Sequence, residues 1–230
     1  MANKLAPTKT CLVYDLGVKG YLEALELQER LAAARVAGEV DDVLLLLEHP
    51  SVFTIGRSGE VDNILAPDLV RQNSAVFYTS RGGDITYHGP GQLVGYPILS
   101  LKASGLSVHQ YVWNLEETVI ITLACLGIGG HRVAGYRGVW VGEDKVCSLG
   151  IRVSHGVSQH GFALNVNTDL EYFTYIVPCG ITDKGVTSVA RLSGQEVEMQ
   201  RVKECVIHSF SRVFEVNLKQ GGSIETCLVE

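Results

Sequence analysis

Apolar side chains recur along the chain at two spacings, which predict alternating helices and strands. Spacings of three and four residues predict helices over 21–36, 107–126 and 201–218. Short continuous or alternating apolar runs predict strands over 43–48, 75–79, 93–99, 139–141, 145–153 and 162–166. Ser107 and Gln110 form a candidate capping box. The alternation favours an α/β fold in which helices pack on a mixed sheet.

Length and composition fit one folded domain. The chain has 230 residues, of which 46% are hydrophobic and 19% charged, a balance that excludes a disordered chain. No linker or repeat interrupts it, so we expect a single domain over 1–230 with loose tails near 1–10 and 220–230. The longest aliphatic run, 43–47, is too short to span a membrane. Nothing at the start resembles a signal peptide, and we expect a cytoplasmic, monomeric protein.

Charge and cysteine spacing exclude further classes. The net charge of −6 argues against a nucleic-acid-binding protein, which needs a basic surface. The six cysteines include no C-x-x-C pair, so we expect no metal site and no disulfide scaffold. Scattered thiols indicate a reducing compartment. One of them is a candidate catalytic thiol, and the others are expected to be small core residues.

A glycine-rich segment, R-G-G-D-I-T-Y-H-G-P-G-Q, runs from Arg81 to Gln92. Glycines let backbone N–H groups approach a ligand closely. The pattern is neither a P-loop nor G-x-G-x-x-G, so it does not indicate nucleotide binding. An ordinary turn between strands is the alternative. The polar residues crowded into it favour a functional loop.

Two further segments carry candidate chemistry. In the strand that begins at Lys145, regular alternation would place this lysine on the apolar face that also carries Cys147. It is either a functional, partly desolvated ammonium or a strand-end lysine that reaches solvent. Farther on, H-G-F-A-L-N spans His160 to Asn165, and P-C-G places Cys179 in a turn, where a thiol can be exposed. Taken alone, Lys145 is equally compatible with either role, whereas an inert turn cysteine is the favoured interpretation of Cys179, a structural histidine that of His160, and Asn165 carries little signal.

Together the segments resemble the octanoyltransferase family, whose pattern is R-G-G-x-x-T-x-H-G-P-G-Q, a lysine-led strand ending in G-I, H-G-x-x-x-N and then P-C-G. The upstream E-H-P around His49, with Thr54, Gly56 and Arg57, also fits. The match spans about 43–192 and keeps the order of the motifs. The resemblance implies the mixed α/β fold of the biotin and lipoate protein ligases.

The resemblance also implies an activity, namely transfer of an octanoyl group from acyl carrier protein to a lysine of a lipoyl domain. Acceptors would be the lipoyl domains of 2-oxoacid dehydrogenases and the H protein of glycine cleavage. It implies that Cys179 is the nucleophile, that Lys145 is its partner, and that no ATP, metal or other cofactor is used. It implies substrate contacts at Arg81, Gly82, Gly83, Asp84, Ile85, Thr86, Tyr87, His88, Ser148, Leu149, Gly150, Gly161, Phe162 and Ala163, supported by His49, His160 and Asn165.

An acidic carrier protein needs a basic surface on a chain of net negative charge, and Arg57, Arg71 and Arg81 are candidates for it. Three alternatives compete with transfer. An ATP-dependent lipoate or biotin ligase would need nucleotide and no catalytic cysteine. A non-catalytic acyl-binding protein would not need Cys179 or Lys145. A cysteine hydrolase, with Cys179 and His160 as the pair, would release free octanoate without an acceptor.

Overall fold

A mixed sheet forms the centre of the molecule in the computed structural model, which describes residues 9–177, 184–222 and 224. Its strand order is β12-β1-β2-β6-β10-β9-β8-β7, and the two-residue β11 pairs with β9. Neighbours of β1 run parallel to it, whereas β2, β6, β10, β9, β8 and β7 follow one another antiparallel. The strands are β1 (Lys9–Val18), β2 (Asp42–Glu48), β6 (Gln92–Ile98), β7 (His131–Val133), β8 (Tyr136–Val141), β9 (Asp144–Ser154), β10 (Val157–Asn165), β11 (Gly185–Val186) and β12 (Val216–Gln220).

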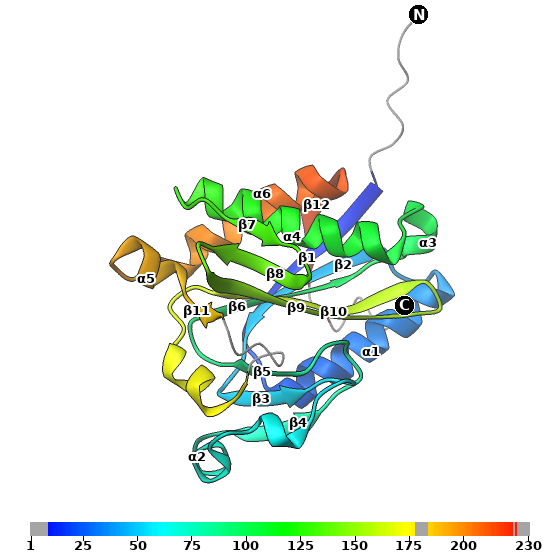
Figure 1. Ribbon diagram of the computed structural model, residues 1–230. Helices are drawn as coiled ribbons and strands as arrows, with labels where there is room; N and C mark the ends of the chain where they lie inside the picture. The colour runs from blue at the N-terminus through cyan, green and yellow to red at the C-terminus, as the bar shows by residue number, and fades with distance from the viewer. Residues whose placement is uncertain (1–8, 178–183, 223, 225–230) are drawn as a thin grey trace, which may run out of the picture.

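Over the described ranges, four helices cover one face of this sheet, and another helix with a small second sheet lies on the other (Figure 1). The first face carries α3 (Leu101–Ser104), α4 (Val108–Cys125), α5 (Val189–Ser193) and α6 (Met199–Phe214). We call it the α4 face, defined by the buried side chains of Val139, Cys147, Phe162 and Leu164. The opposite face, defined by Val94, Tyr96 and Ala163, is called the pocket face, and α1 (Tyr21–Ala37) packs on it.

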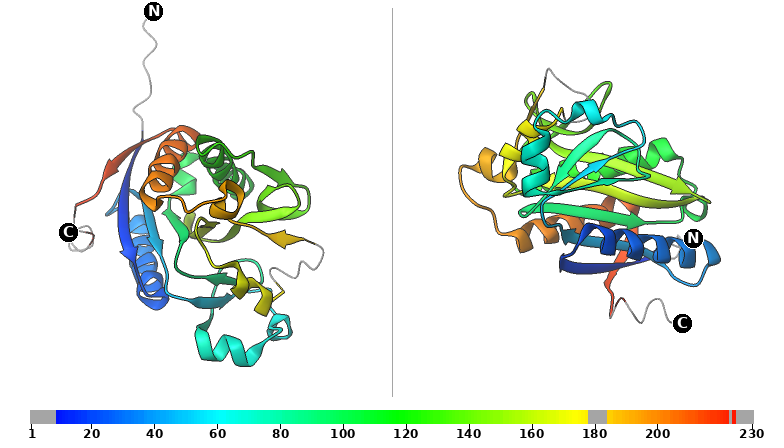
Figure 2. Two further views of the ribbon diagram at one scale, coloured as in Figure 1. Left: turned by 90° about the vertical axis from the view of Figure 1, so that its left-hand side faces the viewer. Right: turned by 90° about the horizontal axis from the view of Figure 1, so that it is seen from below.

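A small sheet with strand order β4-β3-β5 lies beside α1 under the pocket face, as the right-hand view of Figure 2 shows. It consists of β3 (Val52–Ile55), β4 (Ala75–Tyr78) and β5 (Ile85–His88). The 3-10 helices η1 (Val61–Asn63) and η2 (Leu170–Tyr175) and the helix α2 (Pro67–Asn73) surround it. Its own apolar cluster includes Phe53, Ile85 and Phe173. The space between the two sheets is therefore bounded on both sides by rigid strands.

Several predicted elements are confirmed, and their sequences explain them. Strand β2 is apolar from Val43 to Leu47 because Leu44 and Leu46 face one core cluster and Leu45 faces the other. Helix α4 begins after Ser107, whose hydroxyl accepts the Gln110 N–H at 3.1 Å. The Gln110 side chain instead donates to Asn114, so the reciprocal half of the predicted capping box does not form.

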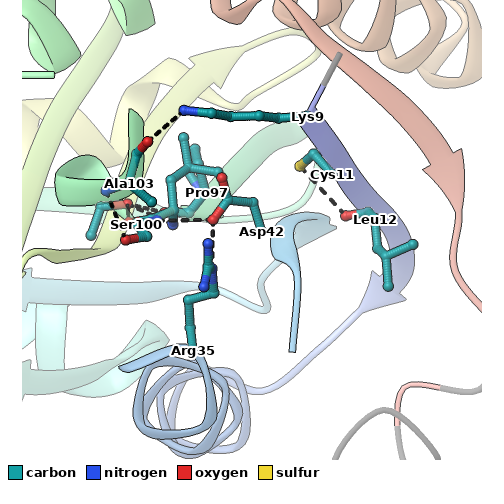
Figure 3. A network of polar contacts seen from close by, with 10 residues as sticks. Lys9, Cys11, Leu12, Arg35, Asp42, Pro97, Ser100 and Ala103 are labelled. Carbon is teal, nitrogen blue, oxygen red and sulfur yellow. Dashed lines mark hydrogen bonds and ion pairs between the residues drawn. The ribbon is translucent and has the colours of Figure 1, made fainter. Parts of the chain in front are cut away.

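A buried carboxylate fixes the end of α1 to the sheet (Figure 3). Asp42 Oδ1 accepts from Arg35 Nε at 2.7 Å and from the backbone N–H of Ser100 at 2.9 Å. Asp42 is 5% exposed, so the ion pair is shielded from solvent. Helix α1, β2 and the start of α3 are joined through one residue.

Three sequence predictions are wrong in detail. The helix predicted over 201–218 ends at Phe214, because Glu215 adopts φ +53° and Val216–Gln220 pairs with β1 as a parallel strand. Strand β1 begins at Lys9, inside the predicted tail. The glycine-rich segment is not only loop, since β5 forms within it. The single-domain assignment stays a prediction.

Two cysteines also differ from the expectation of free core thiols. Cys125 at the end of α4 and Cys205 in α6 form a disulfide, with their Cα atoms 6.3 Å apart. Among the described residues, Cys11 and Cys147 are the free cysteines, and both are buried. The disulfide ties together the two long helices of the α4 face, which also pack against each other through apolar residues.

Candidate active site

A narrow pocket opens between the pocket face of the main sheet and the small sheet. Strands β9 and β10 form its floor, and β5 with the loop that precedes it forms its roof. Tyr21 of α1 and Tyr96 of β6 complete its wall. The lining residues are Tyr21, Arg81, Gly83, Thr86, His88, Tyr96, Ser148, Leu149, Gly150, His160, Gly161, Phe162 and Ala163.

Arg81 places a buried guanidinium in this pocket. Its Nη2 donates to the Thr54 backbone oxygen at 2.7 Å and to Thr54 Oγ1 at 2.9 Å, and its Nη1 donates to the Gly82 carbonyl at 3.1 Å. The loop lies flat on β3 because Gly56 has no side chain, and a Cβ there would collide with the Gly83 carbonyl. These bonds fix the Arg81 side chain over Gly150 of the floor, where a Cβ would meet Arg81 Cδ at 2.9 Å.

A chain of hydrogen bonds connects the pocket to the Lys145 strand. His88 Nδ1 lies 2.8 Å from Gln92 Oε1, so this nitrogen carries the proton. Gln92 Nε2 donates to Asn165 Oδ1 at 2.9 Å. Asn165 Nδ2 donates to the Thr187 carbonyl at 3.0 Å, and the Thr187 N–H donates to the Lys145 carbonyl at 3.0 Å. Gln92 therefore orients the His88 ring, and neither Gln92 nor Asn165 lines the pocket.

Lys145 reaches the pocket face because β9 is irregular. Trp140 of β8 pairs with Lys145, whereas the preceding Val139 pairs with Cys147, so Val146 is an extra residue in β9. Cross-strand partners share a face, and Val139 and Cys147 both belong to the α4 face. Lys145 consequently lies on the opposite face, with Nζ 4.8 Å from the centre of the Trp140 ring.

The predicted position of Lys145 is therefore wrong: it does not share the apolar face of Cys147. Alternation along β9 instead puts it on the face of Ser148 and Gly150, which line the pocket. The bulge redirects the side chain, an effect that a regular-strand reading of the sequence cannot anticipate. Lys145 is 5% exposed, so it does not project into solvent, and it lies beside the pocket without lining it.

A second irregularity redirects His160. Its register partner Ile151 packs on the α4 face, yet the His160 ring packs edge-on against Tyr96 of the pocket face, with centroids 6.2 Å apart. His160 has φ +56°, a conformation that non-glycine residues rarely adopt. Its N–H donates to Gln28 Oε1 of α1 at 2.8 Å. Gln28 of α1 thus satisfies the buried backbone donor of His160.

Burial keeps the pocket histidines neutral. Burial, followed by the positive charges of Arg81 and Arg152, lowers the pKa of His160 to about 3. Burial, followed by the neighbouring His49, lowers the pKa of His88 to about 3. Burial also lowers the pKa of His49. A neutral imidazole can donate or accept a hydrogen bond at physiological pH, but it is a weak base at this pKa.

The described thiols do not suit nucleophilic chemistry. Burial raises the pKa of both Cys11 and Cys147, which disfavours the reactive thiolate. Cys179, the predicted nucleophile, lies outside the described residues. The described chain resumes at Lys184, and β11 then runs parallel to β9, with Gly185 beside Asp144 and Val186 beside Lys145. Gly185 and Val186, which follow Cys179 by six and seven positions in the sequence, therefore lie beside the start of β9.

The sequence is similar to a known protein family and to named members of it. The family model for the lipoyl protein ligase A/B catalytic domain matches residues 20–211. The chain belongs to this family. An octanoyltransferase of Solibacter usitatus is 50% identical over 218 residues, covering 94% of this chain and 98% of that protein. An octanoyltransferase of Caldicellulosiruptor saccharolyticus is 50% identical over 84% of each chain.

Solved structures agree on the fold of this lipoyl protein ligase A/B family. A putative lipoate protein ligase from T. acidophilum has a TM-score of 0.76 at 17% identity and covers 95% of this chain and 92% of its own. A lipoate-protein ligase A bound with ATP has a TM-score of 0.74 at 16% identity and covers 96% of this chain and 92% of its own. The predicted family resemblance, the predicted enzyme class and the predicted mixed α/β fold are confirmed.

The pocket gathers many of the residues predicted from the family motifs, but not all of them. Arg81, Gly83, Thr86 and His88 line it together with the predicted residues of β9 and β10, 148–150 and 161–163. His160 also lines it. His49 and Asn165 do not line it but hydrogen-bond to other residues near it, His49 to the Tyr96 hydroxyl and Asn165 to the Gln92 side chain. Lining residues that the sequence reading missed are Tyr21 and Tyr96, whose apolar surroundings gave them the pattern of core residues.

Four predicted substrate contacts lie elsewhere. Ile85 and Tyr87 alternate with Thr86 and His88 along β5 and pack into the core of the small sheet. Asp84 accepts from the Asn63 side chain and from the Ile85 N–H, both at 2.6 Å, and so holds the loop. Gly82 donates its N–H to the Ile151 carbonyl at 2.8 Å. These four residues support the roof of the pocket from outside it.

The prediction that Arg81 belongs to an exposed basic docking surface is wrong, because the residue is 7% exposed and lines the pocket. Arg57 and Arg71 are exposed and remain available for such a surface. Within the described part of the chain, no cluster of three or more metal-binding side chains occurs. Over the same residues, no helix is long and apolar enough to cross a membrane.

Proposed function

We propose that the protein transfers an octanoyl group from the phosphopantetheine thiol of acyl carrier protein to a lysine of a lipoyl domain, without ATP or a metal ion. The observation that carries this proposal is the 50% identity to a curated octanoyltransferase over 94% of the chain. The pocket supports it, since its floor of small residues and its apolar lining suit an acyl chain.

In the first half-reaction, the Cys179 thiolate attacks the carbonyl carbon of the octanoyl thioester. The C–S bond to phosphopantetheine breaks, and the carrier thiolate leaves with the proton held by Lys145. One thioester replaces another, so the step is nearly isoenergetic. The Lys145 ammonium stabilises the Cys179 thiolate before attack. The placement of Lys145 on the pocket face, beside β11, supports this role.

In the second half-reaction, the acceptor amine attacks the enzyme thioester. A C–N bond forms, the C–S bond to Cys179 breaks, and the proton of the amine passes to neutral Lys145. The thiolate–ammonium pair is thereby restored and the protons balance over the cycle. The histidines at pKa values of about 3 are poor acceptors for this proton, which favours Lys145 over His88 and His160. We assign these histidines to hydrogen bonding and to the shape of the pocket.

An ATP-dependent ligase is the second candidate, because the solved neighbours include lipoate protein ligase A bound with ATP. One assay separates the two. Apo lipoyl domain is incubated with the protein and either octanoyl-acyl carrier protein without ATP, or free octanoate with ATP and magnesium. We expect octanoylation of the lipoyl domain from the carrier thioester alone. Octanoylation that requires octanoate and ATP would instead establish a ligase, and release of free octanoate without acceptor would establish a hydrolase.

A further inference from the structure

We propose that Tyr96, fixed by His49, is the end wall of the acyl pocket and sets the length of the acyl chain that the enzyme accepts. This inference rests on the proposed function, since it assumes that the pocket holds the acyl group. It assigns a specificity role to a residue outside the sequence motifs described above.

The floor of the pocket has a direction. Ser148 of β9 pairs with Ala163 of β10, and two residues farther from Lys145, Gly150 pairs with Gly161. The row at the glycines lies five residues along β9 from Lys145, or roughly 15 Å at the usual strand rise. Because the reacting atoms lie near Lys145 in the proposed function, the glycine row is the distal part of the pocket.

Tyr96 stands at this distal row. Its neighbour Gly95 pairs with Phe162, so the next position of β6 comes beside Gly161. The Tyr96 side chain belongs to the pocket face and lines the pocket. Its ring meets His160 edge-on. An aromatic ring thus stands beside the glycine floor at this distal row.

Hydrogen bonds hold the Tyr96 ring in place, and its hydroxyl makes the far end of this wall polar. The Tyr96 hydroxyl lies 2.8 Å from His49 Nε2, and His49 Nδ1 lies 2.7 Å from the Lys19 carbonyl. The carbonyl only accepts, so Nδ1 carries the proton and Nε2 accepts from Tyr96. His49 is 0% exposed. Moving the ring would leave a buried imidazole nitrogen without its donor, which is costly.

The wall formed by Tyr96 disfavours acyl chains that are longer than the pocket and also chains that are shorter. A longer chain must displace the Tyr96 ring or press its methyl end against a buried hydroxyl. A shorter chain leaves distal space unfilled and buries less apolar surface. The best substrate is the one whose methyl end reaches the ring without moving it.

The test compares variants with opposite effects on the length of the pocket. Transfer to apo lipoyl domain is measured with hexanoyl, octanoyl, decanoyl and dodecanoyl carrier thioesters. For Tyr96→Leu, we expect the decanoyl-to-octanoyl ratio of kcat/KM to rise about tenfold, from two further buried methylenes. For Tyr96→Trp, we expect the hexanoyl-to-octanoyl ratio to rise by a similar factor.

Tyr111→Leu is the matched control, because Tyr111 is an equally buried tyrosine on the α4 face whose hydroxyl donates to the Pro97 carbonyl. It should lower stability and leave both ratios unchanged. Equal loss of activity at every chain length in both Tyr96 variants overturns the inference. If Tyr96→Leu does not fold, the Tyr96→Trp ratio decides alone. Wild-type protein that transfers no acyl group contradicts the proposed function itself, whereas octanoyl transfer with unchanged ratios contradicts only the role of Tyr96.

Discussion

Acidification should destabilise this protein strongly, because His88 and His160 are buried in the neutral form. Both have a pKa of about 3 in the folded protein against an ordinary value of 6.5. Between these values the unfolded chain binds more protons than the folded one, so the free energy of unfolding falls as the pH falls. At pH 5 each histidine removes about 2 kcal/mol of stability relative to pH 8. The pair therefore removes about 4 kcal/mol, a large part of the ~5–15 kcal/mol that stabilises a typical domain.

Urea unfolding at pH 8, 6.5 and 5, followed by tryptophan fluorescence, measures this dependence. The double variant His88→Gln with His160→Gln should be less stable at pH 8 and should lose much less on acidification. His109→Gln, which removes an exposed histidine, is the matched control and should keep the wild-type slope. A wild-type free energy that stays flat between pH 8 and 5 would refute the reasoning, as would the same loss in the double variant.

Three further predictions concern single side chains. Lys145→Met should lower the transfer rate by about 10²–10⁴-fold while the far-UV spectrum is unchanged, and full activity would remove Lys145 from the mechanism. Gln28→Leu should lower the free energy of unfolding, measured in urea, by about 1–3 kcal/mol, since the buried His160 N–H loses its acceptor. An unchanged free energy of unfolding would show that this N–H finds another acceptor. Cys125→Ser should lower the free energy of unfolding of the oxidised protein by up to about 4 kcal/mol, for a loop of 80 residues, and should have no effect in reductant. Equal melting temperatures of the wild type and the variant without reductant would show that the disulfide contributes nothing to stability.

Elements with strong local signals were predictable from the sequence. Helix α4 shows an unbroken apolar stripe after a Ser107 cap, and β2 is apolar from Val43 to Leu47 because both of its faces are buried. Strand β12 was not, because its apolar residues continue the helical spacing of α6 and only pairing with the distant β1 decides its conformation.

The residue types of the site were predictable, but the directions of their side chains were not. Lys145 and His160 both depend on breaks in strand alternation, an extra residue at Val146 and a left-handed backbone at His160. Neither break has a local sequence signal of its own. The role of Tyr96 was not predictable, because it lies in a mostly apolar strand. A tyrosine that packs in a core and a tyrosine that lines a pocket occupy the same kind of position in such a sequence.

The central claim is that the acyl group passes through a thioester on Cys179. The direct test is the intact mass of the protein after incubation with octanoyl-acyl carrier protein, without ATP or acceptor. We predict a gain of one octanoyl group, lost in Cys179→Ala, kept in Cys147→Ala, and discharged when apo lipoyl domain is added. An octanoyl adduct that persists in Cys179→Ala, or transfer to the lipoyl domain at the wild-type rate by that variant, would contradict the account.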